Sequence, residues 1–272
     1  MDAFLIAHEG AVRLACFAGV FALVALLERL RPRRKASVPR LRRWIDNLSV
    51  SALGALAVRW ALPLGEVAFA VWVAERGWGF FNQVHWPQWI EFALAVLALD
   101  FVIYWQHRLF HLVPWLWRLH LMHHADLDFD LTTGSRFHPL EFLLSAGIKL
   151  GAIALLGPAA LAVLAFAVLL NVCAVFNHSN WHLGERLDRA LRLLLVTPDM
   201  HRVHHSSLVE ETNSNFGFNI PWWDRLFGSY RAQPALGHQQ MQIGLAPLRD
   251  PKRLTLPWML ALPFLRIQAR QS

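Results

Sequence analysis

The sequence is poor in cysteine and in acidic residues. Its 272 residues include two cysteines, Cys16 and Cys173, and both lie in apolar runs. They form neither a regular cysteine spacing nor a CxxC pair, which argues against a disulfide framework or a thiol site. Charged residues make up 17 % of the chain, and the 19 acids are outnumbered by 26 lysines and arginines. No low-complexity segment marks a linker between separate soluble domains.

Apolar residues dominate the chain instead. They account for 56 % of it, and the mean hydropathy is +0.34, which is typical of a multi-spanning membrane protein. The formal charge of +7 then indicates cytoplasmic flanks and contact with anionic lipid, and not nucleic-acid binding. Thirteen tryptophans fit the belts at membrane interfaces.

The apolar runs predict an all-α bundle with three spans plus a helical hairpin. The spans cover about residues 12–30, 48–74 and 89–105, and a basic cluster at 29–43 makes the first a signal anchor with that cluster in the cytoplasm. Runs at 142–156 and 159–176, separated by Gly157-Pro158, form the hairpin. Within the runs we expect Arg59 and Glu66 to form a pair or to mark a kink, and Lys149 to pair or to reach the interface.

Ten of the fourteen histidines fall into two HxxxH pairs and two HxxHH triplets. Positions i, i+3 and i+4 share a helix face, so each group directs its imidazoles to one place. Imidazole is a common ligand for iron, copper, nickel and zinc, and ten ligands suggest two adjacent ions. Unconnected surface or core histidines are the alternative, but they rarely form four ordered groups. The ten are His107, His111, His120, His123, His124, His178, His182, His201, His204 and His205.

These motifs resemble the fatty acid hydroxylase and sterol desaturase superfamily of integral-membrane di-iron oxygenases. The likeness covers roughly residues 90–232 and rests on HRLFH, HLMHH, NHSNWH and HRVHH, followed by NSNFGFNIPWWDRLFGSY. That last segment departs from the family's more usual NYG and WDRLFGTY. The resemblance implies two iron ions, with zinc able to replace them in isolated protein. It also implies hydroxylation or desaturation of a lipid with O2.

The order of segments predicts the organisation of the chain. Residues 1–88 would be membrane-anchor helices, 89–232 the catalytic domain and 233–272 an interfacial tail. Two spans separate the basic cluster from the first histidines, and the hairpin returns the later ones to the same side. We therefore expect a histidine-rich metal-binding cap on the cytoplasmic face, most simply of a bacterial inner membrane.

Several further residues are candidates for orienting the metal ligands. Asp100 and Tyr104 share a helical stripe with His107 and His111, and a buried carboxylate often accepts the free N–H of a metal-bound histidine. Asp199, in the helix start Thr197-Pro198-Asp199, and Asn177 are weaker candidates. His138, in FHPLE, is expected to begin a helix next to Pro139 more readily than to bind metal.

Three functions remain open at this stage. An O2-dependent lipid hydroxylase or desaturase is favoured, and the lack of an HPGG haem-binding sequence implies a separate electron donor, such as ferredoxin or a cytochrome b5-like protein with its reductase. A membrane zinc hydrolase would need fewer ligands. A metal transporter or other metal-binding protein would need polar residues along a path across the bilayer. Glu141, Glu185, Glu210 and Glu211 lack the Glu-x-x-His pairing of soluble di-iron bundles, so an all-imidazole set of ligands is expected.

Overall fold

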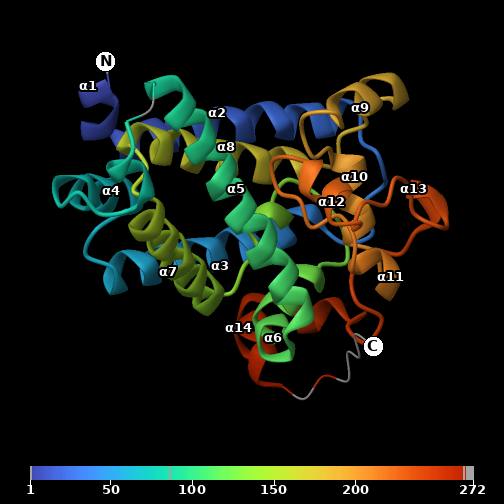
Figure 1. Cartoon of the computed structure of the whole chain (residues 1–272). Coiled ribbons are helices and arrows are strands. Elements are labelled where there is room, and N and C mark those ends of the chain that lie inside the picture. Colours follow the sequence, from blue (N-terminus) through green and yellow to red (C-terminus); the bar gives the residue numbers. More distant parts are fainter. Residues whose placement is uncertain (1, 86, 266, 268–272) are drawn as a thin grey trace.

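The computed structural model describes residues 2–85, 87–265 and 267, and it confirms an all-helical fold with no strand among those residues (Figure 1). In chain order the helices are α1 Asp2–Ala7, α2 Glu9–Leu30, α3 Arg40–Ala61, α4 Glu66–Glu75, η1 Phe80–Gln83, α5 Gln88–Leu112, α6 Pro114–His124, η2 Thr133–Ser135, α7 Pro139–Leu156, α8 Ala160–Asn177, α9 Glu185–Leu191, α10 Pro198–His204, α11 Val209–Thr212, α12 Trp222–Leu226, α13 Gly237–Gln240, η3 Pro251–Leu254, α14 Leu256–Ala261 and η4 Leu262–Phe264.

Among the described residues, five segments are long and apolar enough to cross a membrane, and they coincide with the apolar runs found in the sequence. Four are α2, α5, α7 and α8, and the fifth is the stretch Arg40–Gln83, in which residues 62–65 separate α3 from α4. Pro63 lies in that break, where it cannot donate the backbone hydrogen bond that a continuous helix needs. The expected turn between α7 and α8 is also present, and Gly157 closes α7 in the left-handed conformation at φ 65°.

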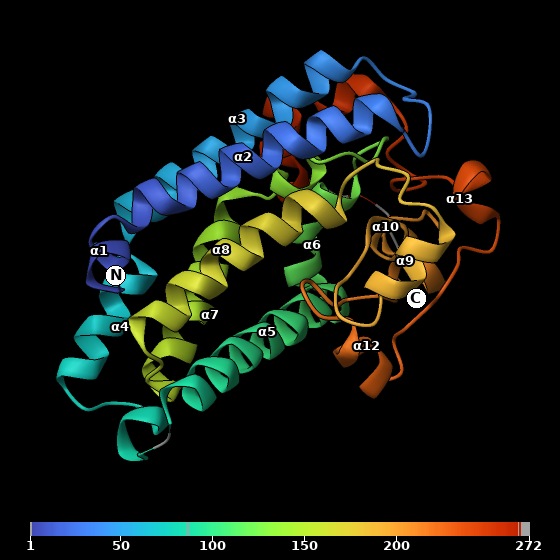
Figure 2. The same cartoon turned by 90° about the horizontal axis from the view of Figure 1, so that it is seen from above.

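The two helices joined by this turn pack on different neighbours. α7 lies mainly against α3 and α4, whereas α8 lies against α2, α4 and α5. Figure 2 shows α8 running between α2 and α5 along the length of the bundle. The predicted hairpin therefore contributes one arm to each side of the bundle.

Of the pair or kink expected at Arg59 and Glu66, the structure has the kink and not the pair. The Glu66 carboxylate pairs with Lys149 Nζ at 2.5 Å, and not with Arg59. The break at residues 62–65 removes the helical register that would have placed Arg59 and Glu66 on one face, and it brings α4 against α7 instead.

The shorter helices α6 and α9–α13 gather at one end of the bundle, where α2, α5 and α8 end (Figure 2). Buried ion pairs join this cap to the long helices. Arg43 of α3 binds Asp126 and Asp130 at 2.8 Å each. Glu28 of α2 accepts the backbone N–H groups of Leu131 and Asn180. Paired charges of this kind are costly to break, so they hold the cap in register with the bundle.

The C-terminal segment predicted as an interfacial tail packs on the protein in its described part. α14 lies against α3, and η4 lies against α6. Met259 and Leu262 are buried with Trp117 and Leu121 in one apolar cluster. Residues 266 and 268–272, which also belong to the predicted tail, lie outside the described residues.

Candidate metal centre

Three helices and one helix end supply the clustered histidines. α5 continues without interruption through His107 and His111, as the sequence predicted. α6 begins at Pro114 and carries the first triplet, while α10 begins at Pro198 and carries His201 and His204 of the second triplet, with His205 next in the chain. Thr197 caps α10 by accepting the N–H of Met200, which confirms the expected helix start. His178 directly follows α8.

The histidines form two groups that could each hold a metal ion. Within each group the potential ligand atoms lie within 4.8 Å of one another. One group contains His107, His111, His120, His124 and His204, and the other contains His123, His178, His201 and His205. The structure thus brings together nine of the ten histidines in the predicted set.

Each triplet contributes to both groups. On α6, the i and i+4 residues His120 and His124 belong to the first group, while His123 belongs to the second. The second triplet has the opposite arrangement, since His201 and His205 join the second group and His204 joins the first. The HxxHH spacing therefore reflects two neighbouring sites that share the same helices.

The two groups are adjacent. The rings of His124 and His205 are stacked across the boundary with their centroids 4.5 Å apart, and those of His201 and His204 are 5.1 Å apart. These separations are as short as those within a group, such as 4.7 Å between His111 and His124. Two ions held here would be close neighbours, as the number of histidines suggested.

The buried ring nitrogens of the clustered histidines are better placed to bind metal ions than to form hydrogen bonds with one another. The Nε2 atoms of His123 and His201 lie 3.2 and 3.0 Å from Nε2 of His178. All three imidazoles therefore approach one another with their Nε2 atoms. In the first group, the buried Nε2 atoms of His107, His111, His120, His124 and His204 have no hydrogen-bond partner among the described residues. Unsatisfied buried nitrogen is costly. Coordination of metal would satisfy these lone pairs at once.

Burial keeps the imidazoles neutral, which is the form that binds metal. It lowers the pKa of His120 and of His178 to about 3. The pKa values of His123, His124, His201, His204 and His205 also lie well below the usual range, because burial and then the neighbouring imidazoles oppose a positive charge.

Hydrogen bonds on the opposite ring nitrogen orient four of the histidines. Nδ1–H of His107 donates to the Phe216 carbonyl at 2.8 Å, and Nδ1–H of His204 donates to the Ser214 carbonyl at 2.7 Å. His178 donates to the Ala174 carbonyl at 2.8 Å. The fourth bond joins His120 Nδ1 to Oε1 of Glu141 at 2.7 Å. Such bonds fix the tautomer and leave Nε2 free to coordinate.

His182 is the predicted ligand that the structure does not bring to the centre. α8 ends at Asn177, so the i, i+4 relation between His178 and His182 no longer applies. The backbone N–H of His182 donates to the Arg31 carbonyl, and Trp181 forms an isolated bridge with Pro32. These contacts direct the segment towards the link between α2 and α3.

The predicted orienting residues make other contacts. Asp100 accepts the indole N–H of Trp223 at 2.8 Å, and Asn177 donates to the Phe218 carbonyl. Asp199 pairs with Arg33 at 3.0 Å and also with Arg202. These three hold the segments that flank the histidines, and no contact of theirs with a clustered imidazole is found among the described side chains.

Tyr104 acts on the centre through a chain of contacts. Its hydroxyl lies 2.9 Å from Oγ of Ser229, which donates to Asp224. Asp224 accepts the N–H groups of Phe216 and Gly217 at 2.8 Å each. Phe216 is the residue whose carbonyl orients His107. Tyr104 and Asp224 thus help to position a histidine that neither of them touches.

Two contributions were not foreseen from the sequence. Glu141 belongs to the FHPLE segment that drew attention to His138, but its partnership with His120 depends on the crossing of α6 and α7. His138 itself caps α7 and lies outside both groups, as expected. Asn215 adopts a left-handed conformation at φ 52° and binds the carbonyls of Met200 and Arg231, which fastens residues 214–217 beside α10.

A cavity of about 780 Å³ leads from the histidines into the bundle. His107, His120 and His123 lie at one end of it, and aromatic side chains such as Phe110, Phe137 and Phe142 line its walls. The ring of Phe137 stacks on His123 at 4.3 Å. The volume and the apolar walls are in the range of small-molecule and lipid sites.

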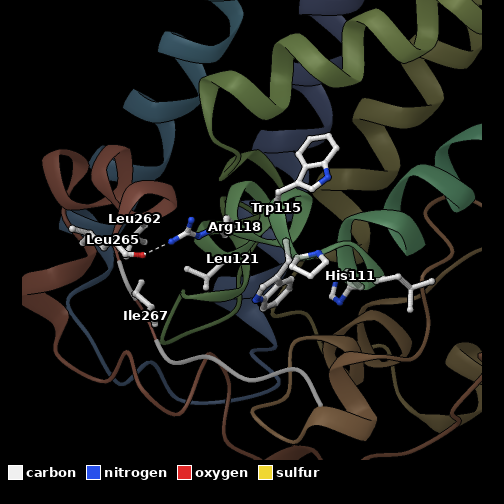
Figure 3. Close-up of a pocket in the computed structure, with 10 residues that line it drawn as sticks. His111, Trp115, Arg118, Leu121, Leu262, Leu265 and Ile267 are labelled. Carbon is white, nitrogen blue, oxygen red and sulfur yellow. Dashed lines mark hydrogen bonds between the residues drawn. The ribbon is translucent and has the colours of Figure 1, made fainter.

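A second pocket of about 430 Å³ reaches the centre from the side of the C-terminal segment. Figure 3 shows His111 at one side of it and Leu262, Leu265 and Ile267 at the other. Arg118 donates to the Leu265 carbonyl at 3.2 Å and so links α6 to this segment. Trp117 also lines this pocket, and its ring lies 5.0 Å from that of His111.

Comparison with known proteins matches residues 92–229 to the fatty acid hydroxylase family model. The chain belongs to the fatty acid hydroxylase family. The matched region begins in α5 and ends just after α12, so it contains every histidine of both groups. No solved structure matches the chain significantly.

Curated relatives share parts of their length with the chain. An ornithine lipid hydroxylase of Rhizobium tropici is 30 % identical over 78 % of this chain and 65 % of its own. The human alkylglycerol monooxygenase is 31 % identical over 51 % of this chain and 30 % of its own. Methylsterol monooxygenase 2-2 of Arabidopsis thaliana is 28 % identical over 62 % of this chain and 63 % of its own. The chain thus spans less than two thirds of the length of each of these relatives.

Proposed function

We propose that this protein is a membrane-bound oxygenase that uses O2 and external electrons to hydroxylate or desaturate a lipid. The observation that carries the proposal is the pair of adjacent imidazole groups at one end of a cavity with aromatic walls inside a bundle of long helices. Membership of the fatty acid hydroxylase family supports the same conclusion, as do the names of the relatives, which are lipid hydroxylases and monooxygenases.

Iron is the metal we assign to both groups. His107, His111, His120, His124 and His204 would hold one ion, and His123, His178, His201 and His205 the other. When bound, two iron ions would supply the oxidising power that an unactivated C–H bond requires. In hydroxylation one oxygen atom enters the lipid and the other leaves as water. Two electrons and two protons come from outside.

The residues of the chain orient the imidazoles, exclude water from the cavity and keep the imidazoles neutral. Phe216, Ser214, Ala174 and Glu141 hold imidazole N–H groups, so that the opposite nitrogens face the two ion positions. Phe110, Phe137 and Phe142 exclude water from the cavity that would hold the lipid. Burial keeps the ligands neutral before metal binds.

We place the protein in a membrane with α2, α3, α5, α7 and α8 as spans and the histidine cap on the cytoplasmic side. The basic residues between α2 and α3 support this orientation, since positive loops remain in the cytoplasm. A separate protein, such as a ferredoxin or a cytochrome b5-like protein with its reductase, would deliver the electrons there.

The decisive experiment uses the full chain purified in detergent and loaded with iron under reducing conditions. We expect about two irons per chain, as two groups of ligands require, and O2 consumption that depends on a lipid and a reductant. Mass spectrometry of lipids from cells with and without the gene identifies the product by a gain of one oxygen or a loss of two hydrogens. Full activity in metal-free protein, or in the absence of O2, would refute the proposal.

A further inference from the structure

Charged residues line the end of the large cavity opposite the histidines. They are Glu9, Arg13, Arg59, Glu66 and Lys149, and they come from α2, α3, α4 and α7. Ionisable side chains within membrane-spanning segments are costly unless they pair or serve a ligand. Their presence in the same cavity as the metal ligands therefore needs an explanation.

One ion pair and longer-range electrostatic attraction account for most of these charges but not all. Lys149 pairs with Glu66 at 2.5 Å, and Arg13 lies within electrostatic range of Glu9 and Glu66. Arg59 has no hydrogen-bond or ion-pair partner among the described residues. Three cations thus face two carboxylates, and one positive charge remains in excess at this end.

The two ends are separated by a defined length of helix. Glu141, which holds His120, and Lys149 are eight residues apart on α7, and a helix rises about 1.5 Å per residue, so about 12 Å separates them along the axis. About 12 Å along α7 therefore separates the residue that holds His120 from the charged end.

We propose that this charged end binds the anionic group of an amphipathic lipid, a carboxylate or a phosphate, with Arg59 as its main partner. The apolar part of the lipid then fills the cavity between the phenylalanines, and the carbon that reacts lies about 12 Å from the anion, as the separation along α7 indicates. This inference rests on the proposed function for the reaction itself, and it adds the substrate class and the position of attack. Arg59 is a binding residue that sets which carbon reaches the histidines.

A binding experiment with purified full-length protein tests the inference without turnover. The probes are oleate, oleyl alcohol, dioleoyl phosphatidate and dioleoyl phosphatidylcholine, each measured by displacement of a fluorescent fatty acid. Charge-assisted hydrogen bonds contribute about 1.5–3 kcal/mol, so we expect an anionic probe to bind about tenfold or more tightly than the neutral alcohol. Preference for oleate over phosphatidate identifies a carboxylate ligand, and the reverse identifies a phosphate.

Matched variants test whether Arg59 causes the preference for anionic probes. Arg59→Gln should lose most of the tenfold preference, and Arg59→Lys should keep much of it. Arg76→Gln removes an arginine that packs over Trp72 outside the cavity, and it should bind as the unaltered protein does. Equal binding of oleate and oleyl alcohol by the unaltered protein would overturn the inference, as would an unchanged preference in Arg59→Gln.

The result of this binding test can be distinguished from the result of the test of the proposed function. A protein without iron or O2 consumption that still selects anionic probes through Arg59 would refute the oxygenase and keep the binding site. An active oxygenase that binds neutral and anionic probes alike would support the oxygenase and refute the binding site. In an active enzyme, Arg59→Gln should also spread the modification over several carbons, as mass spectrometry of the products would show.

Discussion

His120 and Glu141 are joined by a hydrogen bond of 2.7 Å between Nδ1 and Oε1, and both side chains are buried. The bond connects the first histidine triplet to the first turn of α7. Loss of such a partner typically costs about 10–100-fold in metal affinity or activity. We therefore expect Glu141→Ala to bind metal about 10–100-fold more weakly. Glu141→Gln should bind it better than Glu141→Ala, because the amide oxygen can still accept the N–H.

Metal titration of the purified variants against a competing chelator measures this effect. Glu185→Ala, which removes an exposed carboxylate at the start of α9, is the control and should behave as the unaltered protein does. An affinity of Glu141→Ala equal to that of the control would show that Glu141 does not support the centre.

His178 and His182 form an HxxxH pair in the sequence, but the structure places only His178 in a group of ligands. We expect His182→Ala to retain both metal ions, because its side chain lies outside the two groups. His178→Ala should lose the ion of the second group, which has four imidazoles to begin with. Metal content per chain, determined by elemental analysis, distinguishes the two. Equal losses would mean that His182 is also a ligand.

Gly217 occupies a position where a side chain would collide with Asp224. A Cβ there would lie 2.6 Å from Oδ2 of Asp224 and 2.9 Å from the Ile220 carbonyl. We expect Gly217→Ala to destabilise the fold by about 1–3 kcal/mol, since the loop must shift to make room. Because Phe216 and His107 depend on the same loop, metal content should fall as well.

Thermal unfolding in one detergent, with metal analysis of the same samples, tests this. Gly147→Ala is a suitable control because nothing lies within 4 Å of the added Cβ and alanine favours a helix. It should unfold at the same temperature as the unaltered protein or higher. If Gly217→Ala were as stable and as rich in metal as Gly147→Ala, the loop would not be needed at the centre.

The proposed cytoplasmic orientation of the cap predicts which positions a membrane-impermeant thiol reagent can reach. After Cys16 and Cys173 are replaced by alanine, His85→Cys should be labelled in intact cells, since it is exposed in the loop before α5. Glu210→Cys, exposed on the cap, should be labelled only after the cells are broken. The reverse pattern would place the histidines outside the cytoplasm.

The sequence by itself determined the helical class, the long apolar segments and the histidines that could meet. Hydropathy reports length and burial in lipid directly, and the 3.6-residue period of a helix places i, i+3 and i+4 on one face. That local rule anticipated His107 with His111, but it was wrong in placing each triplet at a single site, because each triplet divides between the two groups. The starts of α7 and α10 were also predictable, because proline and a capping residue favour a helix N-terminus.

Only the tertiary structure decided how the histidines divide between two groups, and that His182 belongs to neither. The division depends on the crossing of α5, α6 and α10, which no spacing in the chain encodes. Glu141 and Lys149 acquired their partners in the same way, from helices that meet far from their own sequence neighbours. The charged end of the cavity likewise exists because α2, α3, α4 and α7 converge there.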